Sequence, residues 1–349
     1  MEKQKNIQNM IDFLVCPGFS VESGRISQVN EAAERLFLTP GTEMASLLVT
    51  GQEEYASLHS GCLYLTLSLA GDSRGAVVTV MEDCQLVLVD QDQELRELQV
   101  LALAAQELRT PLSNIMISAE RVVPAEDTSR EYQGRMNRGL NQMLRLVGNM
   151  SDALRYAKGW QPETRNVPAM AAELCEKAQV LCAEKNINLS YQIPDREIYS
   201  LVDPEQLERS FYNLLSNALK FTPEGGSIQV SLTRRKKLLC LSIQDSGSGI
   251  AQGVLQNVFT RYRREPSLED SRYGLGLGLV MVRAAAANHG GTVLIDAPEK
   301  GTRVTVTLAI QQTGKAMLRT PKLRVDYAGE RDHGLLELSE VLPAPLYES

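Results

Sequence analysis

Three polar side chains within residues 207–222, LERSFYNLLSNALKFT, have the types and the spacing of a ligand-binding surface. Asn213, Asn217 and Lys220 recur at i, i+4 and i+7, so on a helix they form one stripe. Carboxamide oxygens can ligate a hard cation such as Mg2+, and a lysine ammonium can meet phosphate as a point charge. Taken alone, the stripe is explained better by an ordinary amphipathic helix with a solvated side. Its neighbours in the sequence favour a site for a metal-bearing anion such as Mg-nucleotide.

Two glycine-containing segments follow the stripe and suit other parts of a nucleotide. Apolar alternation over residues 239–243 predicts a half-buried strand that ends in DSGSGI. Asp245, at that strand end, can accept a hydrogen bond from an exocyclic amine, and the glycines after it allow a ligand to approach the backbone. The segment GLGLGL at residues 274–279 runs into a helical apolar stretch, a pattern that directs free N–H groups at phosphate. No βαβ unit with a later acidic residue surrounds it, which excludes a Rossmann nucleotide fold.

In this order the segments NLLSNALKFTPEGG, DSGSGI, VFTRYRR and GLGLGL resemble the N, G1, F and G2 boxes of the sensor histidine kinases. The ATP-binding domain of that family has the Bergerat fold of gyrase, Hsp90 and MutL. The resemblance implies ATP and Mg as cofactors. It implies a nucleotide site that comprises Asn213, Asn217, Lys220, Phe221, Asp245, Gly247, Gly249, Arg264, Gly274, Gly276, Gly278 and Leu279.

Matching positions in the family imply a role for each part of this site. Asn217 would be the Mg ligand, Lys220 would contact phosphate or ribose, and Asp245 would accept from the adenine amino group. Gly247 and Gly249 would shape the base pocket. The glycines of GLGLGL would form the hinge and the phosphate end of an ATP lid.

The charged segment between residues 251 and 273 is expected to form that lid, and it contains four arginines. The resemblance implies that one of them lies near the γ-phosphate, and we assign Arg264 to that position. Asn213 stands where the hydrolysing members of the superfamily carry a general-base glutamate. An amide cannot take a proton from water, so the match favours the kinase branch over the chaperone and topoisomerase branches.

A helical hairpin is predicted before the nucleotide domain, over residues 91–160. Apolar residues repeat with alternating spacings of 3 and 4 over residues 98–122, and again over residues 136–154 after a break at 124–129. Two such helices carry more apolar surface than one hairpin can cover. A homodimeric four-helix bundle is therefore the expected arrangement.

The first helix contains AQELRTPL, which resembles the phosphoacceptor motif H-E-L-R-T-P-L of the histidine kinases with Gln106 in place of the histidine. The family's imidazole attacks the γ-phosphorus through a nitrogen lone pair, but the lone pair of a glutamine amide is delocalised into the carbonyl. Gln106 therefore cannot be the phosphoacceptor. The three histidines of the chain, His59, His289 and His333, lie in other segments and do not replace it. The chain is predicted to be unable to autophosphorylate in cis.

The resemblance leaves several functions open for such a chain. Glu107, the base beside the acceptor in the family, and Thr110, which positions water during dephosphorylation of a response regulator, are both present. The chain could be a phosphatase for a receiver domain through Thr110, a kinase that acts in trans on an intact partner in a heterodimer, or a non-catalytic scaffold. A sequence error that hides a histidine codon is a further alternative.

Composition narrows the class of protein and its location. The 349 residues carry a formal net charge of −7, which argues against a general nucleic-acid binder. No run approaches 18 apolar residues and no signal-peptide core follows the N-terminus. The six cysteines show no metal-ligand spacing. We expect a cytoplasmic protein without a membrane span, in contrast to most of the family.

The expected fold class is α+β multidomain. Residues 10–90 resemble a PAS-like sensor in the segment GRISQVNEAAERLF, with a helix near Asn30 and hairpin strands near residues 63–80. Residues 91–160 form the dimerisation hairpin, and residues 161–312 a Bergerat-type α/β sandwich with a mixed sheet covered on one face by three helices. Residues 313–349 are a tail with a possible short amphipathic helix, to which the sequence assigns no role.

Overall fold

The computed structural model describes residues 8, 10–12, 16–90, 127–158, 160–250, 277–298, 300–311 and 332–347, and between 104 and 119 it describes residues 104, 105, 108, 112, 113, 115, 117 and 119. Several predicted positions lie outside the described residues, namely Gln106, Glu107, Thr110, Arg264, Gly274 and Gly276. Among the helices of the described ranges, none has the length and the apolarity to cross a membrane.

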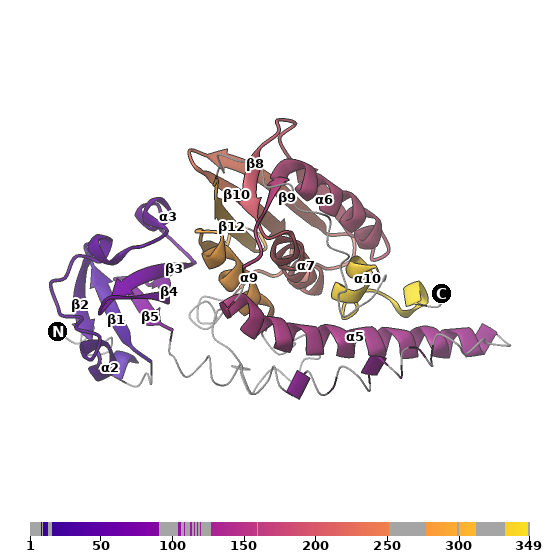
Figure 1. Ribbon diagram of the computed structural model, residues 1–349, viewed down its shortest axis with the longest axis horizontal. Coiled ribbons are helices and arrows are strands. Elements are labelled where there is room, and N and C mark those ends of the chain that lie inside the picture. The colour runs from indigo at the N-terminus through magenta and orange to yellow at the C-terminus, as the bar shows by residue number, and fades with distance from the viewer. Residues whose placement is uncertain are drawn as a thin grey trace.

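The N-terminal unit is an antiparallel sheet with short helices, as the sequence predicts (Figure 1). Its strands lie in the order β2-β1-β5-β4-β3. Their bounds are β1 Gly18–Glu22, β2 Arg25–Val29, β3 Cys62–Leu69, β4 Asp72–Val80 and β5 Gln85–Val89, and the helices between β2 and β3 are α2 Glu31–Glu34, η1 Met44–Leu47 and α3 Gln52–Ala56. Asn30 caps α2 because its Oδ1 accepts from the N–H of Ala33 at 2.9 Å. The tight β3–β4 turn is formed by Ala70 and Gly71, both at positive φ.

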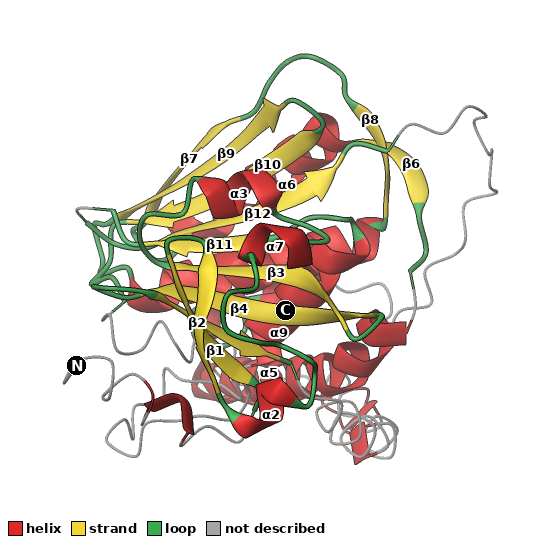
Figure 2. Cartoon of the chain, turned by 90° about the vertical axis from the view of Figure 1, so that its left-hand side faces the viewer, coloured by secondary structure: helices red, strands yellow, loops and turns green. Residues whose placement is uncertain are grey.

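The predicted mixed sheet of the second domain is confirmed. Strands β7 Asn188–Gln192 and β9 Ser227–Arg235 are parallel, whereas β10 Leu238–Asp245, β11 Val293–Asp296 and β12 Arg303–Ala309 continue the sheet in antiparallel pairs. Helices α6 Val167–Ala183, α7 Pro204–Phe221 and α9 Leu277–Asn288 lie on one face of it (Figure 2). A separate pair joins β6 Glu163–Asn166 to β8 Tyr199–Val202.

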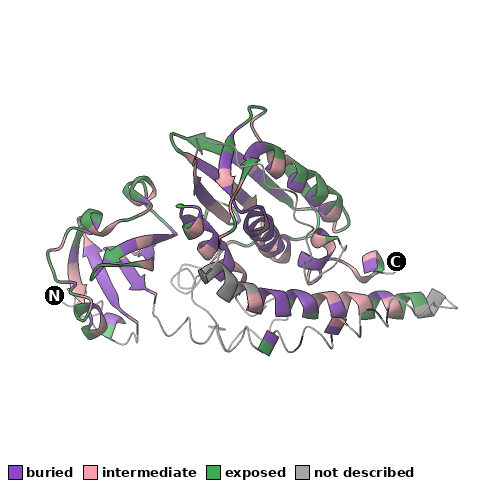
Figure 3. Ribbon diagram, viewed as in Figure 1, coloured by how far each residue is buried: buried purple, intermediate pink, exposed green. Residues whose placement is uncertain are grey.

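Helix α7 forms where its capping residues and apolar spacing predict. Asp203 accepts a hydrogen bond from the N–H of Gln206 through Oδ1 at 3.2 Å, and Pro204 occupies the first turn. The apolar stripe from Leu207 to Ala218 is buried, and α7 is one of the most buried helices of the domain (Figure 3). Burial on nearly all sides fixes this helix and so fixes the side chains it carries.

The sheets of the two units join along one edge, which the sequence does not predict. Strand β11 pairs antiparallel with β3, in the register Val293 with Tyr64, and the strands run as one series across both units (Figure 2). Arg283 of α9 lies 2.9 Å from an oxygen of Asp90, and its guanidinium stands 5.1 Å from the ring centroid of Tyr64. The Tyr64 hydroxyl donates to Asp90 at 2.9 Å. The end of the N-terminal unit is thus tied directly to the core of the second domain.

Helix α5 Asp127–Lys158 runs beside the described part of the preceding helix and supports the second domain (Figure 1). One heptad stripe is buried within the chain, in a cluster that contains Ala105, Leu112, Ala119, Leu140, Leu144, Val147, Met150, Leu277 and Leu336. A second apolar set at the same spacing of seven stays exposed: Leu108, Ile115, Met136 and Met143. The predicted seam is therefore split into a stripe that this chain covers and a stripe that it does not.

His289 is a structural residue in the turn that follows α9. Its Nε2 accepts from the N–H of Asp203 at 2.9 Å, so its Nδ1 carries the proton and donates to the carbonyl oxygen of Ala285 at 2.6 Å. The ring also meets Trp160 edge to face. Burial lowers the pKa of His289 below 6.5, although the bond to Ala285 and the charge of Asp203 oppose this.

This environment predicts a loss of stability in mild acid. As the pH falls, this histidine binds a proton in the unfolded chain before it does so in the folded chain. Its contribution to the free energy of unfolding is therefore fully present above pH 6.5 and is lost as the pH falls below that value. The expected slope is up to about 1.4 kcal/mol per pH unit. Urea unfolding between pH 7.5 and 5.5 measures it. His289→Gln should flatten the slope and His59→Gln should not; an unchanged slope in His289→Gln would contradict this role.

Candidate functional site

The end of α7 meets the turn after β10, and only glycine fits at the contact. A Cβ on Gly247 would lie 2.4 Å from the carbonyl oxygen of Phe221 and 2.8 Å from Oδ1 of Asp245. Gly249 adopts φ +73°, a conformation that side chains rarely tolerate. The structure therefore brings four of the predicted residues, Phe221, Asp245, Gly247 and Gly249, into one wall.

Asp245 is held by one carboxylate oxygen and offers the other. Oδ1 accepts from the N–H of Gly247 at 2.8 Å and from the N–H of Thr302 at 3.3 Å. Within the described ranges no residue donates a hydrogen bond to Oδ2 of Asp245. Burial raises the pKa of Asp245, and the backbone hydrogen bonds partly oppose it. A fixed, poorly solvated acceptor oxygen of this kind can bind the amino group of a heterocyclic base.

Two residues of this wall, Gly301 and Thr302, were missed by the sequence reasoning. A Cβ on Gly301 would lie 1.9 Å from the carbonyl oxygen of Asp245, and its φ is +79°. The carbonyl oxygen of Thr302 accepts from the N–H of Asp245 at 2.9 Å. The available signal was the sequence KGT directly before β12, because a glycine at a strand start often marks a close backbone approach.

The stripe on α7 is divided between two environments. Asn213 is buried, where its Nδ2 donates to the carbonyl oxygen of Arg209 at 2.9 Å, and its Oδ1 lies 2.9 Å from the position of a Cβ on Gly278. Gly278 therefore lets α9 approach α7 closely. Asn217 and Leu279 are half-buried. Asn217 thus keeps an accessible carboxamide one turn from the end of α7.

Lys220 has a partner that the sequence did not predict. Its ammonium forms an ion pair with Glu340 of the C-terminal tail, and its side chain is only 11% exposed. Burial lowers the pKa of Lys220, and the Glu340 carboxylate opposes this effect. The cation is therefore retained in a poorly solvated place by a nearby carboxylate.

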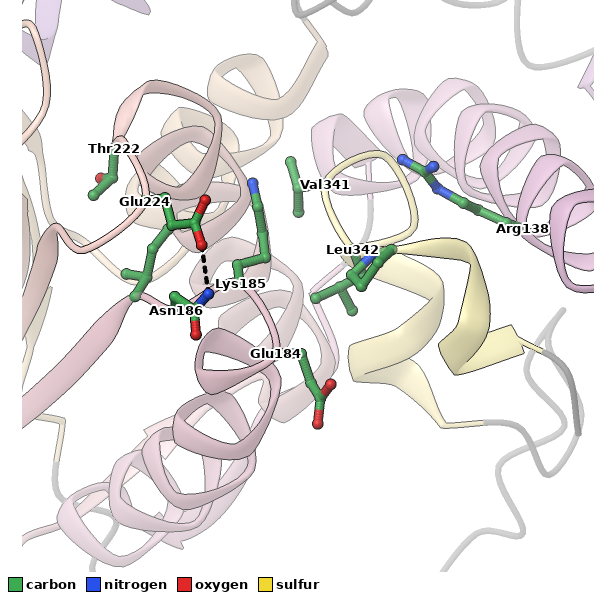
Figure 4. A pocket seen from close by; sticks show the side chains of 10 residues that line it. Arg138, Glu184, Lys185, Asn186, Thr222, Glu224, Val341 and Leu342 are labelled. Atoms are coloured by element: carbon green, nitrogen blue, oxygen red, sulfur yellow. Dashed lines mark hydrogen bonds between the residues drawn. The ribbon is translucent and has the colours of Figure 1, made fainter. Parts of the chain in front are cut away.

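A pocket of about 320 Å3 lies beside the tail (Figure 4). Arg138, Lys185 and Glu224 line it together with the tail residues Val341 and Leu342. Its walls carry both charges, and no residue predicted for the nucleotide lines it. It is a gap beside the docked tail and not the predicted site.

Comparison with known proteins identifies two domains. Residues 202–312 match the family described as histidine kinase-, DNA gyrase B- and HSP90-like ATPase, and residues 96–157 match the His Kinase A (phospho-acceptor) domain. The sensor histidine kinase WalK of Bacillus subtilis is 28% identical over 232 residues, which cover 63% of this chain and 38% of WalK. The adaptive-response sensory kinase SasA of Synechococcus sp. is 28% identical over 252 residues, covering 68% of this chain and 66% of SasA.

This chain thus spans less than two thirds of the length of either relative. The crystal structure of full-length ShkA in complex with AMPPNP is similar in fold, with a TM-score of 0.52 and 20% identity over 63% of this chain and 47% of ShkA. The geometry of the Asp245 wall lies inside the matched ATPase region. The chain therefore carries a His Kinase A domain and a histidine kinase-, DNA gyrase B- and HSP90-like ATPase domain, and over about two thirds of its length it is similar to sensor histidine kinases.

Proposed function

We propose that this chain is a two-component signalling protein that binds Mg-ATP and cannot phosphorylate itself in cis. The observation that carries the proposal is the Asp245 wall, where backbone N–H groups fix one carboxylate oxygen and where Gly247 and Gly301 let neighbouring backbone approach this residue closely. In the same chain the segment AQELRTPL resembles the phosphoacceptor motif H-E-L-R-T-P-L, with Gln106 where that motif has its histidine. The proposal thus combines a nucleotide site with a side chain at position 106 that has no nucleophilic nitrogen.

The residues present fit Mg-ATP. Asp245 would hold the adenine amino group, and the half-buried amide oxygen of Asn217 suits Mg2+, which prefers oxygen ligands. Lys220 would meet the phosphates as a point charge. When bound, Mg-ATP supplies an electrophilic γ-phosphoryl group. The chain's own residues orient the base and neutralise phosphate charge. Position 213 holds an asparagine, whose amide cannot take a proton from water and therefore cannot act as a general base.

A homodimer is part of the proposal. The exposed stripe of Leu108, Ile115, Met136 and Met143 lies on the matched phospho-acceptor domain, and apolar residues at a spacing of seven are typical of a helical interface. A second copy would cover this stripe in a four-helix bundle. The five-stranded N-terminal sheet supports a PAS-like sensor that acts upstream of the hairpin.

The proposed partner is the receiver domain of a response regulator. Glu107 and Thr110 are present beside Gln106, so phosphatase action through Thr110 agrees with the sequence. A second candidate function is kinase action in trans, on the histidine of an intact partner in a heterodimer. The Asp245 wall favours it, because a scaffold needs no formed base site.

Incubation with Mg and γ-labelled ATP tests the proposal, once calorimetry has measured nucleotide binding. We expect no label in the protein as it stands and label in Gln106→His, since only an imidazole restores the nucleophile. Gln106→Asn is the matched control and should stay unlabelled. Label on the unchanged protein would contradict the loss of cis activity. Binding without label in Gln106→His would exclude kinase action in trans and leave a phosphatase or a nucleotide-gated switch.

A further inference from the structure

The C-terminal residues 332–347 are docked between the hairpin helix α5 and the ATP domain (Figure 1). They contain helix α10 His333–Glu337, capped by Asp332, and the short helix η2 Ala344–Tyr347. Leu336 packs in the cluster of α5, whereas Leu338, Leu342 and Tyr347 belong to the core cluster of the ATP domain. These four side chains are at most 4% exposed. We call residues 332–347 the strap, because they bind both domains at once.

Polar side chains of α5 hold the backbone of the strap. Arg138 donates to the carbonyl oxygens of Ser339 at 3.0 Å and Glu340 at 3.1 Å, and Gln142 also donates to that of Ser339 at 3.0 Å. Asn137 donates to the carbonyl oxygen of Tyr347 at 2.9 Å. The strap is therefore positioned by specific backbone contacts and not by apolar packing alone.

Two carboxylates of the strap neutralise three cations from α5 and α7. Glu337 is buried between Arg145, at 3.3 Å, and Arg209, at 3.1 Å. Glu340 lies 3.0 Å from Arg145 and forms the ion pair with Lys220. Although burial raises it, the charges of Arg145 and Lys220 bring the pKa of Glu340 below its usual value. Glu340 is thus a fixed anion at neutral pH.

Lys220 cannot serve Glu340 and a phosphate equally well. Its side chain is largely enclosed, so a second anion nearby would be repelled by Glu340 with little screening from solvent. Glu340 also supplies the negative charge that keeps this buried ammonium protonated without ligand. The Glu340 carboxylate therefore occupies the position beside Lys220 that the proposed function assigns to a nucleotide phosphate.

We propose that the strap is an autoinhibitory element whose Glu340 competes with the nucleotide phosphate for Lys220. The inference rests on the proposed function, since it needs Lys220 to be a phosphate ligand. Binding of Mg-ATP then releases Glu340 and loosens the strap. Because the strap also joins α5 to the ATP domain, its release frees that domain from the hairpin. A partner that captures the strap would raise nucleotide affinity by the same linkage.

Calorimetric titration of the full chain with Mg-ATP tests this competition. Glu340→Gln removes the charge and keeps the size and backbone contacts, and should lower the Kd on the order of tenfold if the strap is docked about nine-tenths of the time. Glu184→Gln is the matched control, an exposed carboxylate of the neighbouring pocket with no cation partner in the described ranges. Glu340→Asp keeps the charge and should stay close to the unchanged protein.

Hydrogen exchange of the unchanged protein gives a second readout that needs no variant. Saturating Mg-ATP should increase amide exchange over residues 338–342. If Mg-ATP binds and Glu340→Gln binds no tighter, or if exchange there does not increase, the strap inference is wrong and the proposed function stands. If neither the unchanged protein nor Glu340→Gln binds Mg-ATP, the nucleotide site itself has failed, and the strap inference is overturned with it.

Discussion

Asp245→Asn is expected to weaken Mg-ATP binding at least about 100-fold while the protein stays folded. Oδ1 of Asp245 accepts two backbone N–H groups, and an asparagine keeps them only by placing its oxygen there. Its amide nitrogen then replaces Oδ2 and presents a donor to the adenine amino group, which is also a donor. One good acceptor is thus exchanged for a repulsive contact.

The folded state should tolerate the Asp245→Asn substitution. Because burial raises the pKa of Asp245 above 3.8, the ionised carboxylate costs folding free energy at neutral pH, and stability contributed by this group falls as pH rises above 3.8. The neutral asparagine removes that cost. Calorimetry and thermal unfolding measure both effects. Asp296→Asn, a carboxylate at the end of β11 whose pKa burial also raises, is the control and should bind normally. Unchanged affinity in Asp245→Asn would refute the assigned base contact.

Glu337→Ala is expected to destabilise the protein by about 3–5 kcal/mol. Glu337 is 2% exposed and lies between Arg145 and Arg209, which are also buried. Removing the carboxylate takes a buried anion away from both guanidinium groups, although Arg145 still lies 3.0 Å from Glu340. They can regain water only if the strap leaves, and that exposes the apolar side chains of Leu336 and Tyr347. Either response costs free energy.

Urea unfolding at pH 7.5 measures this loss. Glu337→Gln separates charge from shape, because it restores the volume and an acceptor but not the negative charge. We expect it to remain destabilised by more than half of the alanine effect. Glu173→Ala, an exposed carboxylate on α6, should change stability by less than about 0.5 kcal/mol. A loss below 1 kcal/mol in Glu337→Ala would show that the arginines do not depend on this residue.

Local elements of this protein were predictable because their signals are local. Asp203 and Pro204 are typical of a helix start and apolar residues follow at helical spacing, so this segment alone indicates α7, and the alternation before Asp245 predicted β10. The Asp245 wall was partly predictable for a similar reason, since carboxylate and glycines follow each other in one turn. Gly301 and Thr302 were missed because they reach that turn through backbone contacts from a distant strand.

The order of the two matched domains, the helices and strands that carry the nucleotide motifs, and the glutamine in the acceptor motif can all be read from local sequence. Which of those residues have partners depends on the folded chain. The pairing of β3 with β11, the burial of one heptad stripe, and the ion pair of Lys220 with Glu340 join segments far apart in the chain. Periodicity shows that a face must be covered, but the segment that covers it is chosen by packing and charge in three dimensions.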